Sequence, residues 1–338
     1  MSSFFERKRL FLTRTRLGVL AVLALCAGQA WSQTVVKLGT LAPEGSVWHD
    51  ALLEIRDDWR RISDGEVELR IYAGGVLGDE DEMIRKMQRR GLDALAVSGS
   101  GLPLIDEIVQ CLQLPLLFDS YAELEQVRDS ISAELEQGFE RAGYKVLNWA
   151  EAGWVHFFGK SPVRTPDDLR ELRLWIGMGS PESERMIEEL GFRGVPLPVT
   201  DMLTGLQTGL IEVIDVPPLF ALLDRSFQAA PFMTDLRFAP LNAATVMTMP
   251  MWERIPEDLR EPFLASAREA AARMREQIHV AETEAIEEMV ARGLTIVRLE
   301  QAEIEAWRNE ARAVYPQLAC ATEHPELYRE VLQLQPDR

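Results

Sequence analysis

Residues 256–293, PEDLREPFLASAREAAARMREQIHVAETEAIEEMVARG, form the stretch that decides the fold. Apolar residues recur there at the three- and four-residue spacing of one helix face, no proline follows Pro262, and Gly293 stands where a helix would end. The apolar positions are Leu259, Phe263, Ala267, Ala270, Met274, Ile278, Ala281, Ala285 and Met289. A helix over 256–292 would be about 50 Å long at roughly 1.5 Å per residue. Because one lobe of a small protein cannot cover that length, we predict a helix that spans two lobes.

The chain before this helix alternates short apolar strands with helical segments. Strands are predicted, in chain order, at 35–38, 67–71, 92–97, 143–149, 172–176 and 210–216. The alternation of strands and helices therefore occurs in two successive sets, which is typical of two α/β lobes. We expect lobe I to comprise 33–149 plus about 240–270, and lobe II to comprise 150–239 plus about 290–320.

One strand end is a candidate binding loop. The strand predicted at 92–97 runs directly into Ser-Gly-Ser-Gly at 98–101. Open α/β sheets bind ligands in the loops that follow their strands. Ser98 is therefore a candidate ligand-binding residue.

The first 32 residues have the layout of a secretory signal peptide. A basic start is followed by an apolar run over 17–27 and by Ala30-Trp31-Ser32, which fits a small-x-small cleavage site. Lipidation at Cys26 is a less favoured alternative, because Leu25 stands where that pattern requires a small residue. The apolar run is shorter than the roughly 20 residues of a membrane span, and no later stretch of that length lacks charges. We expect export and a periplasmic location.

The charge balance excludes several classes of partner. The chain has 36 basic and 54 acidic residues, and cleavage after residue 32 would leave 31 and 53, a net charge of −22. Nucleic acid and anionic lipid surfaces are not expected partners of so acidic a protein. Cys111 and Cys320 are the cysteines that would remain, and the sequence leaves open whether they form a disulfide.

The sequence contains no recognisable catalytic or metal-binding motif. Its four histidines are far apart, and neither a phosphate-binding glycine loop nor a nucleophile motif is present. Glu212 and Asp215 are carboxylates near the expected cleft, but alternate strand positions can equally brace the backbone. We predict no catalytic residue, no metal and no cofactor, and we expect a protein that is not an enzyme; an exported hydrolase is a distant alternative.

A series of short motifs resembles one family of transport proteins. In chain order they are Ala42-Pro43 with Trp48, Gly75-x-x-Gly78, Trp149-Ala150-Glu151, DDLRELRLW at 167–175, TGLQTGLIEVIDVPP at 204–218, and Trp252 with Ile255-Pro256. Together they resemble the DctP-type solute receptors of TRAP (tripartite ATP-independent periplasmic) transporters over nearly the whole mature chain. The resemblance implies two α/β lobes that exchange strands, a long helix bracing both, and a hinged cleft that delivers one small molecule to a membrane permease.

Three positions depart from the family pattern. Trp175 replaces an arginine that holds a ligand carboxylate in most members, Val216 replaces an asparagine, and Trp154 lies where a basic residue often follows. All three changes remove polarity, so we predict a cleft that suits an apolar or amphipathic ligand. The candidate ligand-binding residues are Trp154, Trp175, Val216, Trp48, Ser98, Phe220, Met247 and Arg173.

Two further points follow from the resemblance. If Trp175 instead points into a lobe core, Arg173 or Arg237 becomes the anchor for a short organic acid. A branch of the family that also has tryptophan in place of the arginine works with a periplasmic tetratricopeptide-repeat protein. A second soluble partner is therefore implied for this chain.

Overall fold

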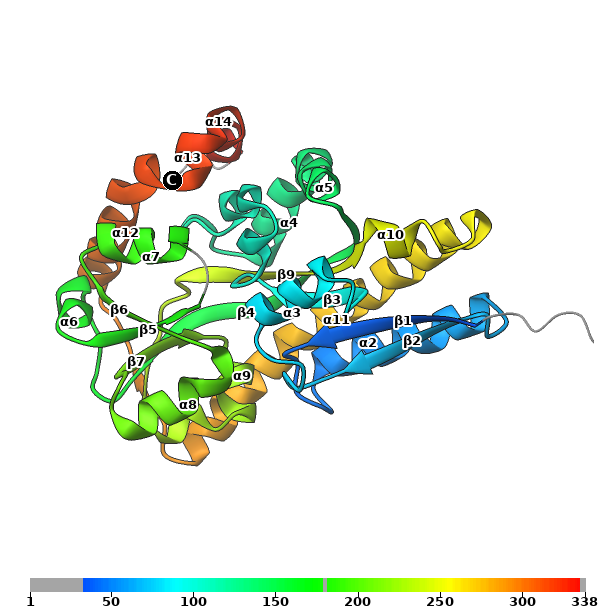
Figure 1. Ribbon diagram of the computed structural model, residues 1–338. Helices are drawn as coiled ribbons and strands as arrows, with labels where there is room; N and C mark the ends of the chain where they lie inside the picture. The colour runs from blue at the N-terminus through cyan, green and yellow to red at the C-terminus, as the bar shows by residue number, and fades with distance from the viewer. Residues whose placement is uncertain (1–32, 179–180, 335–338) are drawn as a thin grey trace, which may run out of the picture.

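The computed structural model describes residues 33–178 and 181–334 (Figure 1). The predicted signal peptide, with Cys26, lies outside the described residues. The strands are β1 (Thr34–Thr40), β2 (Val67–Tyr72), β3 (Ala94–Ser98), β4 (Tyr144–Gly159), β5 (Arg173–Gly177), β6 (Arg193–Leu197), β7 (Val213–Val216), β8 (Phe232–Thr234), β9 (Ala239–Thr248) and β10 (Thr295–Val297). The larger helices are α2 (Val47–Ile62), α3 (Glu80–Gln88), α4 (Tyr121–Ser130), α5 (Ser132–Arg141), α7 (Pro181–Glu189), α8 (Val199–Thr208), α11 (Glu257–Ala291), α12 (Gln301–Val314) and α14 (Pro325–Gln333).

Shorter helical turns connect these elements. The short α-helices are α6 (Pro166–Arg170), α9 (Pro218–Leu223), α10 (Met249–Trp252) and α13 (Ala319–Glu323). The 3₁₀ turns are η1 (Leu102–Leu104), η2 (Glu107–Leu112), η3 (Ser226–Gln228) and η4 (Tyr315–Gln317). None of the helices in the described ranges is both long enough and apolar enough to cross a membrane.

The sheet shows how the two lobes are connected. Its strand order is β2-β1-β3-β9-β4-β7-β5-β6, with β8 beside β4 and β10 beside β8. Residues 144–155 of β4 pair with β9, whereas 156–159 pair with β7. β9 follows β5, β6, β7 and β8 of the second lobe in sequence and yet lies between β3 and β4 in the first lobe. The prediction of two α/β lobes with exchanged strands is confirmed.

The long helix is also confirmed. α11 runs from Glu257 to Ala291, and Gly293 follows it with a φ of 105°, a left-handed conformation that favours glycine. Phe263 stacks on Trp59 of α2 at 4.3 Å in the first-lobe core, and Met289 lies in the second-lobe core. One face of α11 is therefore buried in both lobes in turn, and Figure 1 shows the helix passing from α10 toward α9.

One predicted strand begins later than expected. The strand predicted at 210–216 starts at Val213, because Gly209 ends α8 with a φ of 77° and the next residues complete the turn. The Ile211 N–H donates to the carbonyl of Gly205 at 3.2 Å, so it is not available to a neighbouring strand. Residues 210 and 211 therefore belong to the turn, whereas Glu212 already bonds to the sheet: its N–H donates to the carbonyl of Arg173 at 2.8 Å.

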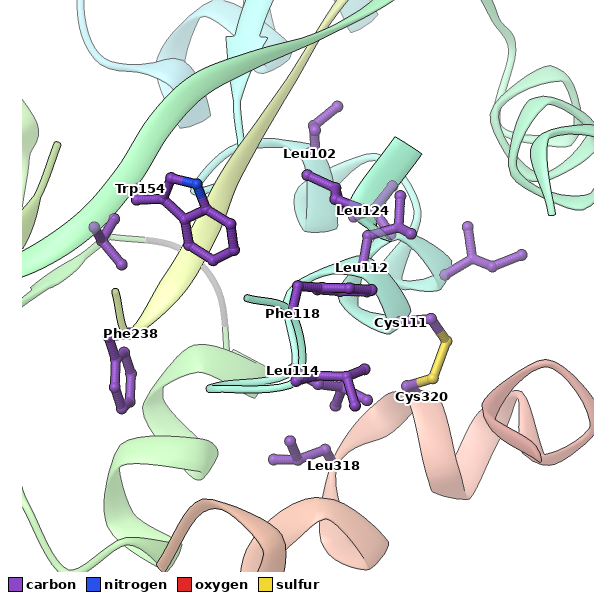
Figure 2. Packing of buried hydrophobic residues seen from close by; sticks show 14 of the residues in the cluster. Leu102, Cys111, Leu112, Leu114, Phe118, Leu124, Trp154, Phe238, Leu318 and Cys320 are labelled. Carbon is purple, nitrogen blue, oxygen red and sulfur yellow. A yellow bond between two sulfur atoms is a disulfide. The ribbon is translucent and has the colours of Figure 1, made fainter. Parts of the chain in front are cut away.

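Cys111 and Cys320 form a disulfide, a point that the sequence left open. Their Cα atoms are 5.0 Å apart, and the bond joins η2 to α13 across 209 residues (Figure 2). Leu112, Leu114 and Leu318 pack around it in the largest buried cluster. Because a cross-link between such distant residues restricts the unfolded chain, it stabilises the fold by about 2–4 kcal/mol in typical cases.

Candidate functional site

A cleft lies between the two lobes, where strand ends from both of them meet. About 1010 Å³ of empty space lies in it, its open mouth included. The first lobe contributes Thr40, Leu41, Ala42, Pro43, Trp48, Ala51, Leu52, Ile55, Glu80, Ala96, Val97, Ser98 and Ser100. The second lobe contributes Trp175, Val199, Asp215, Val216, Pro217 and Phe220. The remaining lining residues come from β4, β9 and α11: Asn148, Ala150, Ala152, Leu241, Ala243, Ala244, Thr245, Ala271 and Met274.

The two faces of β4 differ sharply at the cleft. Asn148, Ala150 and Ala152 line the cleft, and the two alanines leave space above the strand. Because side chains alternate along a strand, Glu151 points the other way. There it is 1% exposed and bonds to Arg128 and Arg275, the latter through Nε at 2.8 Å.

The Trp175 side chain forms part of the cleft wall, and a hydrogen bond fixes its orientation. Its indole Nε1 donates a hydrogen bond to the carbonyl of Leu197 at 3.0 Å, and its side chain is 5% exposed. The ring lies in the same buried cluster as Met202 and Val216. Trp175 therefore belongs to the second-lobe core and to the cleft at once.

The structure brings together five of the eight candidate residues. Trp48, Ser98, Trp175, Val216 and Phe220 all line the cleft. These are residues at strand ends or at the starts of the helices that follow, as expected for an open α/β sheet.

The other three candidates do not line the cleft, which corrects their predicted placement. Met247 is fully buried in the first-lobe core, because it lies near the far end of β9, opposite Lys145. Trp154 follows a register shift in β4 at Gly153, whose φ is 120°, and this shift places its ring in the largest buried cluster (Figure 2). Arg173 lies at the start of β5.

Neither of the two alternative anchor arginines reaches the cleft. Arg173 is bound at the outer surface, where Nη2 donates to the carbonyl of Gly209 at 2.8 Å and lies 3.3 Å from a carboxylate oxygen of Glu212. Arg237 has its guanidinium carbon 5.9 Å from the centre of the Trp154 ring. Of the lining residues that the structure describes, none is a lysine, arginine or histidine.

The cleft contains two carboxylic acids to which the sequence analysis gave no role. Glu80 is 4% exposed, and burial raises its pKa to about 7. Its carboxylate accepts hydrogen bonds from the Ser98 N–H at 2.7 Å and the Ser98 hydroxyl at 2.9 Å. A signal was available, because Glu80 lies on the helix face of the buried residues Met83, Ile84 and Met87.

Asp215 is the second of these acids. It lies on β7 opposite Phe157 and lines the cleft, and burial raises its pKa to about 7. Apart from a hydrogen bond with its own backbone N–H, no neighbour lowers this pKa. Asp215 thus differs from Glu80, whose carboxylate is held by the loop at 98–101.

The lobes touch across the mouth of the cleft. Asp79 caps α3 through one carboxylate oxygen, which accepts from the Glu80 N–H at 2.8 Å. Its other oxygen accepts from the N–H of Val199, the first residue of α8, at 2.7 Å. A free N–H at a helix start favours a negative partner. This hydrogen bond connects the two lobes in a closed arrangement.

Metal coordination is not apparent in the described part of the chain. There, no three or more side chains of histidine, cysteine, aspartate or glutamate are grouped so that they could hold a metal ion. Glu212 is occupied with Arg173, as described above.

The fold and the cleft define a two-lobed receptor that holds a solute between its lobes. Residues 38–321 match the family model described as bacterial extracellular solute-binding protein, family 7 (DctP), and the chain belongs to this family. The 2,3-diketo-L-gulonate-binding periplasmic protein YiaO of Escherichia coli K12 is 21% identical over 280 residues, 82% of this chain and 85% of that protein.

Solved TRAP periplasmic solute-binding proteins have the same fold. One from Xanthobacter autotrophicus Py2 with bound β-D-galacturonate has a TM-score of 0.82 at 17% identity, and covers 88% of this chain and 98% of its own. Another, from Sulfurospirillum deleyianum DSM 6946 with bound succinate, has a TM-score of 0.82 at 19% identity, and covers 90% and 99%. The family consists of receptors rather than enzymes and supplies TRAP transporters in the periplasm.

Proposed function

We propose that this protein is the periplasmic receptor of a TRAP transporter and that it captures an apolar or amphipathic small molecule. The ligand would be held in the cleft and delivered to the membrane permease. One observation carries the proposal: the described cleft lining is mostly apolar, and its charged members are both acidic.

A carboxylate ligand would lack the interactions that usually offset its burial. Desolvating an anion is costly unless a cation or several hydrogen-bond donors compensate. In this cleft an anion would meet Glu80 and Asp215 instead of an arginine. An apolar ligand, by contrast, gains about 25 cal/mol for each Å² of its surface that is buried.

The aromatic residues favour the same class of ligand. Trp175 and Phe220 supply apolar surface from the second lobe, and Trp48 supplies it from the first. Hinge closure would then enclose the ligand between aromatic groups of both lobes.

The partners follow from the resemblance stated for the tryptophan-containing branch. A permease would receive the ligand, and a periplasmic tetratricopeptide-repeat protein would act as a second soluble partner. Cleavage of the signal peptide after residue 32 would release the receptor into the periplasm.

A receptor for a short organic acid is the second candidate. It is favoured by the acids that the similar proteins bind, such as succinate in the Sulfurospirillum structure. It would require Arg173 or Arg237 to leave its present contacts and enter the cleft. The two candidates therefore predict different sensitive residues.

The test is native mass spectrometry of protein purified from the periplasm, with analysis of the organic extract. We expect an apolar or long-chain molecule that is retained in Trp175→Phe, which keeps the apolar wall, and lost in Trp175→Arg. Circular dichroism checks that both variants fold. A short carboxylate that is retained in both and lost in Arg173→Ala or Arg237→Ala would overturn the proposal.

A further inference from the structure

The ionisable side chains among the described lining residues of the cleft are both acidic. The two groups, Glu80 and Asp215, come from opposite lobes, and no basic residue accompanies them among the described lining residues. A ligand in this cleft therefore meets negative charge or protonated acid from both sides.

Asp215 is the acid that is available to a ligand. Glu80 already accepts hydrogen bonds from the N–H and the hydroxyl of Ser98. The Asp215 carboxyl has no ion-pair partner among the described residues, and its side chain is only partly buried, toward the cleft that it lines. An ionised Asp215 would be stabilised by a positive group entering from the ligand.

Among the described residues, no positively charged side chain acts on either acid and could take the place of a cationic ligand. Beside Asp215, His156 of β4 is buried, bonds to the Thr234 carbonyl at 3.1 Å and has a pKa lowered to about 4 by burial, so it is neutral. Beside Glu80, the charged side chain that acts on its pKa is Asp79, which is acidic as well.

The aromatic wall suits a cation better than it suits an anion. Trp48, Trp175 and Phe220 line the same cleft as Asp215. The face of an aromatic ring carries negative partial charge and attracts ammonium groups, above all methylated ones. Aromatic rings together with a carboxylate are the combination that binds organic cations.

We propose that the ligand is amphipathic and cationic, an apolar body carrying an amine or a quaternary ammonium group that Asp215 and the aromatic wall of Trp48, Trp175 and Phe220 hold. This inference rests on the proposed function and narrows it. The positive head group neutralises the acid in the cleft, while the apolar body covers the alanine-rich surface of β4 and β9.

The test compares three ligands that share one apolar body: octyltrimethylammonium, octanol and octanoate, each below its micelle concentration. Protein is first freed of bound molecules by unfolding in urea and refolding with its disulfide intact. Titration calorimetry then gives the three affinities at pH 8. We expect the ammonium ligand to bind at least about tenfold more tightly than octanol, and octanoate to bind most weakly.

Variants assign the effect to Asp215. Asp215→Asn should weaken the ammonium ligand about tenfold and leave octanol unchanged. The matched control is Glu212→Gln, which alters a nearby carboxylate outside the cleft and should change neither affinity. Lowering the pH to 5.5, where Asp215 is protonated, should weaken the ammonium ligand in the wild type and have less effect in Asp215→Asn.

The outcomes separate this inference from the proposed function. Equal binding of octanol and the ammonium ligand would overturn the cationic ligand and leave the apolar cleft supported. Tighter binding of octanoate would overturn the cationic ligand and favour the organic-acid candidate. If none of the three ligands binds, both the cationic ligand and the apolar cleft are overturned.

Discussion

Two acids near the lobe junction have opposite surroundings. Glu151, on the back of β4, is enclosed by Arg128 and Arg275, and Arg128 is itself 5% exposed. Asp215, on the neighbouring strand β7, lines the cleft without a basic partner among the described residues. The charge of Glu151, which has a structural role, is therefore neutralised by two arginines. The charge of Asp215, which a ligand can reach, has no such compensation.

The two acids also differ in their effect on the stability of the fold. A buried ion pair is costly to assemble, but losing one of its members leaves a buried charge without compensation. A half-buried acid without a partner avoids that cost by holding its proton, which is why the pKa of Asp215 rises to about 7. Removing Glu151 should therefore destabilise the protein, and removing the charge of Asp215 should not.

The largest effect is expected for Glu151→Gln. This change leaves Arg128 buried without its carboxylate, and we expect the free energy of unfolding to fall by about 3–5 kcal/mol. Urea unfolding at pH 7 measures it. The matched control is Glu140→Gln, which removes an exposed pair with Lys145 and should cost less than about 1 kcal/mol. An equally small loss in Glu151→Gln would remove the contrast between the two acids.

A smaller effect of opposite sign is expected for Asp215→Asn. The pKa of the acid is roughly 3.9 when unfolded and about 7 when folded, so the folded protein binds the proton more tightly. The contribution of Asp215 to stability therefore falls as pH rises from about 4 to about 7 and stays low above that. At pH 8 we expect Asp215→Asn to be more stable than the wild type by about 1–3 kcal/mol.

Unfolding curves at pH 5 and pH 8 check this sign. The gain in Asp215→Asn should be larger at pH 8 than at pH 5, and Glu212→Gln should show no such difference. A variant that is less stable than the wild type at pH 8 would mean that the charge of Asp215 is compensated in the folded protein.

The smallest effect is expected for Asp79→Ala, at an acid that bonds only to backbone N–H groups. Loss of the α3 cap should cost about 1 kcal/mol of stability. Loss of the hydrogen bond to Val199 should weaken the closed state and raise the Kd of the retained ligand roughly fivefold. Calorimetry measures both, with Asp81→Ala as the control for Kd, because the Asp81 carboxylate pairs with Arg85 of its own helix and not with the second lobe. An unchanged Kd would show that this contact does not stabilise the ligand-bound form.

The fold was largely predictable because the apolar sequence pattern that indicates it is long. The periodic apolar face of residues 256–292 extends over many helical turns, so few other structures satisfy it. The position of Trp175, Val216 and Ser98 in the cleft was also predictable, because each lies at or near the end of a strand and such ends meet in open α/β sheets.

Individual side-chain directions were less predictable. Trp154 was misplaced because the register shift at Gly153 depends on how β4 pairs with β9, which lies far away in sequence. Met247 was misplaced for a related reason, since its distance from the cleft follows from the same pairing. Glu80 was missed because its charge suggested exposure, although its helical spacing indicated burial. The disulfide stayed open because sequence alone gives no distance between Cys111 and Cys320.

The position of β9 fixes an order of events during synthesis. β3 and the first part of β4 both pair with β9, yet residues 239–248 leave the ribosome only after β5, β6, β7 and β8 of the second lobe. Until then each of them has an unpaired edge, which is the kind of surface that associates with other chains. A fragment that ends before residue 239 would retain these open edges. The sheet of the lobe that is made first is thus completed only after most strands of the other lobe have been made.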